Sequence, residues 1–418
     1  MTACASAAML AACGAAGVTP AARGLEGTGA ITNARVPGEK ILWNFTGGAD
    51  GADPIGGPFA DPAGNVYAGT IAGGSSDQGT VVRLAPRHGS YDETTLVTFQ
   101  GRNGSSASGQ LTMDSAGTLY GTTVWGGRYG YGSAFSISTN GRVRERVIWS
   151  FGGTSKDGAN PDAGLVVDAQ GVLYGTTAVG GPFGGGNVFK LTRAGRRDTE
   201  TVLHDFGGAK DGKYPAAPVT LGIDGTVYGT AGGGGNGCSH GCGIVFKLTP
   251  SGSRYSESVL WNFRGATDGS GPSSGVTIDA SGAMYGVTDF GGGTSCADGY
   301  GCGTVYKLTP SASGYTERVL WSFGKGTDGY YPLSNVVIGR NGTLYGTTWQ
   351  GGTHYAGNLW ELVPSGSAYA EKVLWNFTAG DDGGDPRGQM LADARGRLYA
   401  TTYVGGTAGV GTVLRFTP

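Results

Sequence analysis

The stretch Leu173-Tyr174-Gly175-Thr176-Thr177, followed three residues later by Gly180-Gly181, decides the fold because the chain repeats it seven times. In every copy a Gly-Gly pair stands six and seven residues after the tyrosine, and the tyrosines are Tyr67, Tyr120, Tyr174, Tyr228, Tyr285, Tyr345 and Tyr399. A repeat of this regularity indicates one supersecondary unit used seven times. The units fill residues 41–418, and we expect them to form one large repeat domain.

One unit contains four short strands, as the third copy shows. Runs rich in β-branched and aromatic residues at 164–168, 172–177, 187–191 and 200–206 are separated by turn residues, and none has a helical period. We name these strands A, B, C and D in order. Four strands in about 50 residues are typical of a β-propeller blade. The sequence therefore predicts an all-β, seven-bladed β-propeller with four strands per blade.

The two ends of the chain predict how the ring closes. Residues 41–45 resemble a strand D but precede any strand A, and the chain stops at a strand C, residues 412–416. We expect residues 41–45 to pair with 412–416, so that the N-terminal strand completes the last blade. Such pairing removes the open edges of an unclosed ring.

Composition limits the partners. Glycine accounts for 85 of 418 residues, but aromatic residues make up 10% and occur in register, so the glycines are turn residues and not a flexible tract. The net charge of -2 gives no electrostatic footprint for nucleic acid. No run of 18 apolar residues exists, so we predict membrane contact only through a lipid anchor. We further predict a monomer without a cofactor or a metal.

The first residues predict export. Residues 1–13 contain an apolar segment and end in Leu10-Ala11-Ala12-Cys13, which with Gly14 resembles a bacterial lipobox whose cysteine, Cys13, is lipidated. No Lys or Arg precedes the apolar segment, which departs from a secretory signal. Secretion without lipid and a cytoplasmic location are the alternatives. Residues 14–39 are expected to be a flexible linker and 40–418 the propeller, on a bacterial outer-membrane lipoprotein or a secreted or periplasmic protein.

The combined pattern of Leu-Tyr-Gly-Thr-Thr, Gly-Gly, Gly-x-Val-Phe-x-Leu, Val-Leu-Trp-x-Phe and Asp-Gly-x-x-Pro resembles the GloVer tandem repeat of bacterial surface proteins, named for Gloeobacter and Verrucomicrobia. The resemblance covers all seven units. It implies an exported β-propeller held at the cell surface, and it implies no established activity.

Two features of strand D and the loop after it recur too regularly to be a site. Five D strands carry Trp and Phe two residues apart, and we expect both rings to pack between neighbouring blades; a ligand platform is the alternative. Asp-Gly follows strand D at Asp50, Asp157, Asp211, Asp268, Asp328 and Asp382. A ring of acids could collect a cation, but a turn capped by its own carboxylate is the favoured interpretation.

The loops from B to C and from D to A should share one end of the ring. Two of the B-to-C loops are longer, and they contain the pairs Cys238/Cys242 and Cys296/Cys302. Cysteines confined to one loop in an exported protein predict two local disulfides. Free thiols and a metal site with His240 are the alternatives, and the spacing of the second pair does not suit zinc.

Residues that break the repeat on this end are the candidates for ligand binding. Exposed aromatic residues in glycine-rich loops are typical of saccharide or peptide sites, although the rings could instead cover the glycines. The candidates are Trp125, Tyr129, Tyr131, Phe183, Tyr300, Trp349, His354 and Tyr355, with Arg128 and Tyr403 beside them.

No catalytic residues are predicted. The chain has no nucleophile elbow, no HExxH and no phosphate loop, and its four histidines fall in different repeats. Asp298 and Asp385 are carboxylates outside the repeat, but nothing singles them out. We therefore expect a non-enzymatic binding or scaffolding module for an extracellular saccharide or protein. A carbohydrate-active hydrolase or lyase and a purely structural surface protein are the alternatives.

Overall fold

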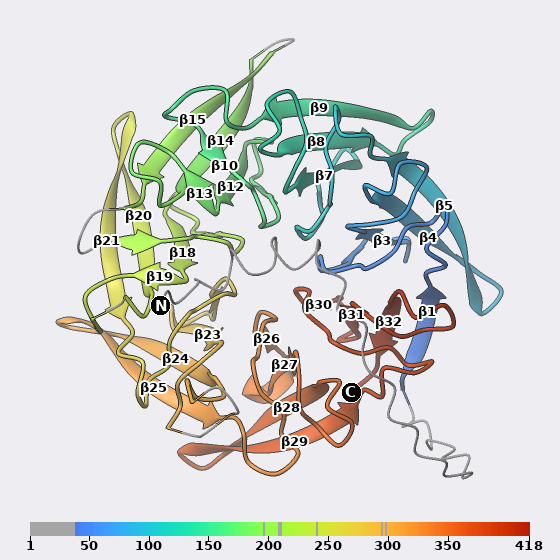
Figure 1. Ribbon diagram of the computed structural model, residues 1–418. Helices are drawn as coiled ribbons and strands as arrows, with labels where there is room; N and C mark the ends of the chain where they lie inside the picture. Colours follow the sequence, from blue (N-terminus) through green and yellow to red (C-terminus); the bar gives the residue numbers. More distant parts are fainter. Residues whose placement is uncertain (1–37, 195–196, 208–210, 240, 294–295, 297–298) are drawn as a thin grey trace, which may run out of the picture.

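Seven four-stranded antiparallel sheets stand as blades around a central axis in the computed structural model, in the order of the sequence (Figure 1). The structure describes residues 38–418 apart from 195–196, 208–210, 240, 294–295 and 297–298. The all-β, seven-bladed propeller predicted from the repeat is confirmed. In these residues no helix is long and apolar enough to cross a membrane. The predicted leader and linker lie outside the described residues and stay predictions.

The strands of the first four blades, from the axis outward, are β2 (Phe59–Ala60), β3 (Val66–Gly69), β4 (Thr80–Arg87) and β5 (Ser90–Thr98); β6 (Thr112–Met113), β7 (Thr118–Thr123), β8 (Ser133–Ser138) and β9 (Arg144–Ser150); β11 (Val166–Val167), β12 (Leu173–Thr177), β14 (Asn187–Ala194) and β15 (Arg197–Asp205); β17 (Thr220–Leu221), β18 (Val227–Ala231), β20 (Ile244–Ser251) and β21 (Arg254–Asn262).

The remaining three blades are β22 (Thr277–Ile278), β23 (Met284–Thr288), β24 (Thr304–Ser311) and β25 (Gly314–Ser322); β26 (Val337–Ile338), β27 (Leu344–Thr348), β28 (Asn358–Ser365) and β29 (Ala368–Asn376), with a 3-10 turn η1 (Arg340–Gly342); β30 (Leu391–Ala392), β31 (Leu398–Thr402), β32 (Thr412–Phe416) and β1 (Lys40–Asn44). The innermost strands have two residues, shorter than predicted.

The N-terminal strand closes the ring. Blue β1 lies beside red β32 in Figure 1, and the two pair antiparallel with Ile41 opposite Leu414 and Asn44 opposite Thr412. The predicted pairing of 41–45 with 412–416 is therefore confirmed. Backbone pairing of the two termini gives the last blade its fourth strand and joins the ends of the ring.

The signature residues each have a structural role. The Tyr120 hydroxyl donates to Asp114 Oδ2 at 2.9 Å and fixes the turn between the first two strands of its blade. Gly175 is required because a Cβ there would lie 2.7 Å from Cζ of Phe189. The first threonine, Thr176, donates to the backbone of the next blade, the Ala217 carbonyl, at 3.1 Å. The stretch is repeated because each blade must make these contacts.

The space between blades is filled by the phenylalanine that follows the outer strand. Its ring is fully buried, and in six blades it packs on an aromatic ring of the next blade, with centroids 5.0 Å apart for Phe151–Phe189 and Phe206–Phe246. The predicted burial of these phenylalanines is confirmed. Burial of seven such rings stabilises the blade interfaces.

The tryptophans of the outer strands are not plain core residues. Every pairing between the third and fourth strands contains a β-bulge just before the position that holds tryptophan in five blades, and the bulge re-aims that side chain. Trp321 is half-buried, and its indole N–H donates to Asp328 Oδ2 at 3.1 Å. The expectation that Trp and Phe behave alike is corrected: the Phe joins two blades, whereas the Trp also ties its strand to the following loop.

Candidate functional site

Two kinds of loop form one end of the ring, which we call the loop face. In each repeat the loop entering the blade pairs with the loop between its second and third strands. The pairs are the ladders β10 (Gly158–Ala159) with β13 (Val179–Gly180) and β16 (Gly212–Lys213) with β19 (Gly233–Gly234), and the bridges Ala52–Ala72, Ser105–Trp125, Ser270–Phe290, Tyr330–Gln350 and Gly384–Val404. The predicted grouping of these loops at one end is confirmed.

The repeated aspartates shape these loops. Asp50 accepts hydrogen bonds from the Thr46 backbone N–H at 3.0 Å and from Trp43 Nε1 at 3.1 Å, and its side chain is buried. Asp268, Asp328 and Asp382 accept the matching backbone N–H in their own loops. The carboxylates cap their own turns, in agreement with the favoured interpretation.

Several of these aspartates lie close to a glutamate on the outer strand of the blade that follows. It stands four residues before the Trp position in all seven repeats, at Glu39, Glu93, Glu145, Glu200, Glu257, Glu317 and Glu371. Burial, and then the negative charge of the neighbouring aspartate, raise the pKa of Glu200 to about 8 and that of Glu317 and Glu371 to about 7. These glutamates therefore bind a proton more tightly near neutral pH than ordinary surface carboxylates do.

At one junction the acid pair lines an open groove. Between blades 2 and 3 a groove of ≈ 490 Å³ is lined by Tyr129, Trp149, Arg146, Asp157 and Glu200, among others. Its volume is in the range of a small-molecule site. Arg146 forms an ion pair with Asp198 at 2.6 Å, and the Arg128 guanidinium lies 5.4 Å from the Tyr129 ring centroid.

One extra residue distinguishes this groove from the other blades. Seven residues separate Trp from Asp where the indole bonds the carboxylate, as in Trp43–Asp50, but eight separate Trp149 from Asp157. Among the described residues Trp149 Nε1 is buried and has no acceptor. Trp261 Nε1 also has no acceptor among these residues, although Trp261 has the usual seven-residue spacing to its Asp. There the Arg264 guanidinium covers the ring, 5.6 Å from its centroid.

The aromatic loop of blade 2 packs on this irregular turn. A Cβ at Gly152 would lie 2.4 Å from Cδ2 of Tyr131, and one at Gly153 would lie 2.8 Å from Cε2 of Tyr129, so the two rings rest on glycines. Both rings nevertheless stay about half exposed. The groove thus offers ring faces, a buried indole N–H without an acceptor among the described residues, and an acid pair in which the pKa of Glu200 is raised.

The central channel is a second break in the symmetry. One residue of each repeat lines the channel. It stands five positions after the Asp of the entering loop, or after Asn103 in the second repeat. The seven residues are Ile55, Ser108, Asp162, Ala216, Ser273, Leu333 and Arg387. Burial raises the pKa of Asp162, which accepts a 2.7 Å hydrogen bond from Ser108. The channel cavity of ≈ 100 Å³ holds a few waters and is too small for a sugar.

The channel mouth carries an arginine between two rings. The Arg387 guanidinium lies 4.6 Å from the Trp349 ring centroid and 4.2 Å from that of Tyr403. Burial raises the pKa of Asp385, while Arg387, 3.9 Å away, and Trp349 partly lower it. Tyr331 extends the row, 6.1 Å from Trp349, and Phe290 links Tyr331 to Tyr300.

The predicted binding residues do not form one cluster. Tyr129 and Tyr131 belong to the groove, Trp349 belongs to the channel mouth, and Tyr300 is joined to the mouth through other rings. Phe183 covers Gly207 and is 67% exposed, and Tyr355 is 77% exposed. Trp125 and His354 are exposed on the same face. The sequence therefore located the face but not the two places where residues converge.

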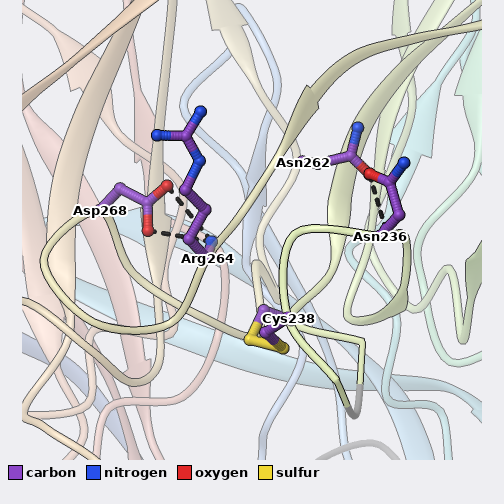
Figure 2. Close-up of a disulfide and its surroundings, with 6 residues drawn as sticks. Asn236, Cys238, Asn262, Arg264 and Asp268 are labelled. Carbon is purple, nitrogen blue, oxygen red and sulfur yellow. Dashed lines mark hydrogen bonds between the residues drawn. A yellow bond between two sulfur atoms is a disulfide. The ribbon is translucent and has the colours of Figure 1, made fainter.

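Both predicted disulfides are present, Cys238–Cys242 and Cys296–Cys302. Figure 2 shows the first one beside the loop entering blade 5, where Asp268 accepts the Arg264 N–H and Asn262 Oδ1 accepts the Asn236 N–H at 3.0 Å. The disulfide thus closes a loop against its neighbours. His240 and Asp298 lie outside the described residues.

Sequence reasoning missed Trp149, Glu200, Arg387 and the channel ring. Trp149 and Glu200 look like ordinary members of the repeat, and only the eight-residue spacing to Asp157 marks them. The channel residues occupy one position that varies while its neighbours repeat. A comparison of the repeats for such irregular positions would have found both.

The structure defines a class of protein, the closed β-propeller. Its repeated blades here carry two irregular features on the loop face, a groove and a channel mouth. The chain belongs to the Gloeobacter/Verrucomicrobia repeat family, whose model matches residues 5–239 and 234–418. The resemblance seen in the sequence is thereby confirmed. Among curated proteins, none matches the chain in sequence.

Solved structures share the fold at low identity. Two structures of the extracellular domain of a protein from B. thetaiotaomicron, described as a one-component and a hybrid two-component system, match with TM-scores of 0.56 and 0.58 and 9% and 10% identity. They cover 90% and 91% of this chain, which spans 40% of theirs. A protein described as a 6-phosphogluconolactonase from Bacteroides uniformis matches with a TM-score of 0.52 and 13% identity, over 80% of this chain and 88% of its own.

Proposed function

We propose that the chain is an exported, non-enzymatic recognition module that binds an extracellular saccharide in the groove between blades 2 and 3. The observation that carries this proposal is the unpartnered, buried Trp149 Nε1 in a groove of ≈ 490 Å³ that also contains the Tyr129 ring and the Glu200–Asp157 pair. A sugar presents apolar CH faces and hydroxyl groups. It would stack on the ring, accept from the indole and bond to the carboxyl groups.

The channel mouth is the second candidate for the same function. Arg387 between Trp349 and Tyr403 offers a cation and ring faces, an arrangement that recurs in no other repeat within the described part of the chain. Because the channel itself is too small for a sugar, a ligand here would lie across the mouth. A protein ligand remains the alternative to a saccharide at either place.

A glycan array with the wild-type protein and two double variants tests the proposal. The groove variant combines Tyr129→Ala with Trp149→Phe, and the mouth variant combines Trp349→Ala with Arg387→Ala. We expect the groove variant to lose glycan binding and the mouth variant to keep it. The opposite result would move the site to the channel mouth, and no glycan binding by the wild type would favour a protein ligand or a structural role.

Hydrolysis is less compatible with the groove. Glycosidases need two carboxyl groups about 5 Å or more apart, whereas Asp157 lies close enough to Glu200 for its charge to raise the pKa of Glu200. Release of reducing ends from a bound glycan, abolished by Glu200→Gln, would nevertheless establish a hydrolase.

Export and anchoring are part of the proposal. The two disulfides support folding in an oxidising compartment. Lipidation of Cys13, which lies outside the described residues, would hold the propeller at the outer membrane. Cys13→Ser should then release the protein from the membrane fraction, and a protein that is soluble with Cys13 intact would contradict the anchor.

A further inference from the structure

His204 replaces the repeated tryptophan at the end of β15. Five repeats have Trp at this position, and in three of them the indole N–H donates to the aspartate of the following loop at 3.1 Å: Trp43–Asp50, Trp321–Asp328 and Trp375–Asp382. In blade 3 the His204 ring takes the place of the indole and presents Nε2 to Asp211. Tryptophan can only donate a hydrogen bond, whereas a neutral imidazole nitrogen can also ligate a metal ion.

Three potential ligands converge there from two blades. His204 Nε2 lies 3.2 Å and 3.3 Å from the two carboxylate oxygens of Asp211. Glu257, on β21 of blade 4, completes a group whose ligand atoms all lie within 4.8 Å of one another. All three side chains are half-buried, with His204 22% and Asp211 17% exposed. Among the described residues, Glu257 Oε1 is buried and has no hydrogen-bond partner, as at the matching Glu145, Glu200, Glu317 and Glu371, but only Glu257 faces a histidine.

We propose that His204, Asp211 and Glu257 bind one divalent transition-metal ion of the zinc type between blades 3 and 4. Ligands about 2.0–2.1 Å from a tetrahedral ion lie about 3.3 Å from one another, which is the His204–Asp211 separation. The Glu257 oxygen lies within 4.8 Å of the other two ligand atoms, so its side chain has to move inward when the ion binds. Water fills the fourth position, as in other zinc sites with three protein ligands.

The chemistry of the donor set selects the class of ion. One imidazole nitrogen with two carboxylate oxygens suits zinc and its neighbours, whereas calcium and magnesium prefer oxygen ligands only. The ion would also occupy the place that faces the buried Glu257 oxygen and offset the two carboxylate charges. Because the ligands come from neighbouring blades, the ion would act as a cross-link between them.

The chain supplies its own matched control in His204→Trp. This variant restores the residue that five repeats carry and whose indole bonds the aspartate, so it removes the ligand while the blade keeps a side chain that the fold accepts. Glu257→Gln removes the second blade's ligand. His88→Asn removes an exposed histidine outside the cluster and should leave Zn²⁺ binding unchanged.

Calorimetric titration of the EDTA-treated, dialysed full chain with Zn²⁺ tests the proposal, together with melting temperature and the visible spectrum with Co²⁺. We expect one ion per chain, a rise in melting temperature, and a Co²⁺ band typical of a tetrahedral site. Zn²⁺ binding should disappear in His204→Trp, weaken at least tenfold in Glu257→Gln and persist in His88→Asn. No Zn²⁺ binding by the wild type, or equal binding by His204→Trp, would overturn the site and leave an ion pair between the three residues.

Discussion

Thr401 in the last blade donates a 2.9 Å hydrogen bond to the carbonyl oxygen of Gly56, 345 residues earlier in the chain. The same bond joins Thr176 to Ala217 within consecutive blades, so the junction between the first and last blades is built like an ordinary junction. The strand β1 adds backbone pairing to it. Ring closure is therefore part of the stability of the whole molecule.

Phe45→Ala should destabilise the protein by about 3–5 kcal/mol, because this fully buried ring packs at the junction with Val82 and Val413. Urea unfolding measures the change, and Ile223→Ala, on a fully exposed side chain, should stay within about 0.5 kcal/mol of wild type. A loss below about 1 kcal/mol for Phe45→Ala would mean that the N-terminal strand does not close the ring in solution.

Trp149→Phe and Trp321→Phe should have opposite effects. The first removes a buried N–H that has no acceptor among the described residues, so stability should be unchanged or higher, while saccharide binding is lost. The second removes a bond to buried Asp328 and should cost about 1–3 kcal/mol without affecting binding. Thermal melts of the two variants provide the comparison, and equal destabilisation would show that Trp149 Nε1 is satisfied in solution.

Stability should fall as the pH rises from about 4.5 to about 7. The pKa of Glu371 is raised from 4.5 to about 7 by burial and by Asp328, so over this range the unfolded chain loses a proton that the folded protein keeps. Glu371→Gln should therefore melt above wild type at pH 8 and close to it at pH 4. Asp381→Asn, on an exposed side chain, serves as the control. A wild-type melting temperature that is flat between pH 5 and 8 would contradict the acid pairs.

Reduction of the disulfides should loosen two loops and leave the propeller folded. Closing loops whose cysteines are 4 and 6 residues apart stabilises by about 2 kcal/mol each at most. Treatment with dithiothreitol should lower the melting temperature by a few degrees while the far-ultraviolet circular dichroism stays unchanged. Cooperative loss of strand structure on reduction would show that the disulfides hold more than their own loops.

The repeat alone determined the architecture. Seven copies of one pattern fixed the number of blades, and the surplus strand at the N-terminus fixed the closure, because a four-stranded blade needs its fourth strand from somewhere. The sequence also predicted the two disulfides, because each cysteine pair lies within one short loop. All of this information lies in the spacing of nearby residues, which can be read from the sequence alone.

Only the tertiary structure showed which departures from the repeat create the groove, the channel mouth and the cluster of potential metal ligands. The Trp149 groove depends on one extra residue before Asp157, and the channel ring depends on which position of the entering loop faces the axis. His204, Asp211 and Glu257 are up to 53 residues apart and meet only because neighbouring blades place their outer strands side by side. Contacts between blades are set by packing across the ring, which no pattern within a single repeat records.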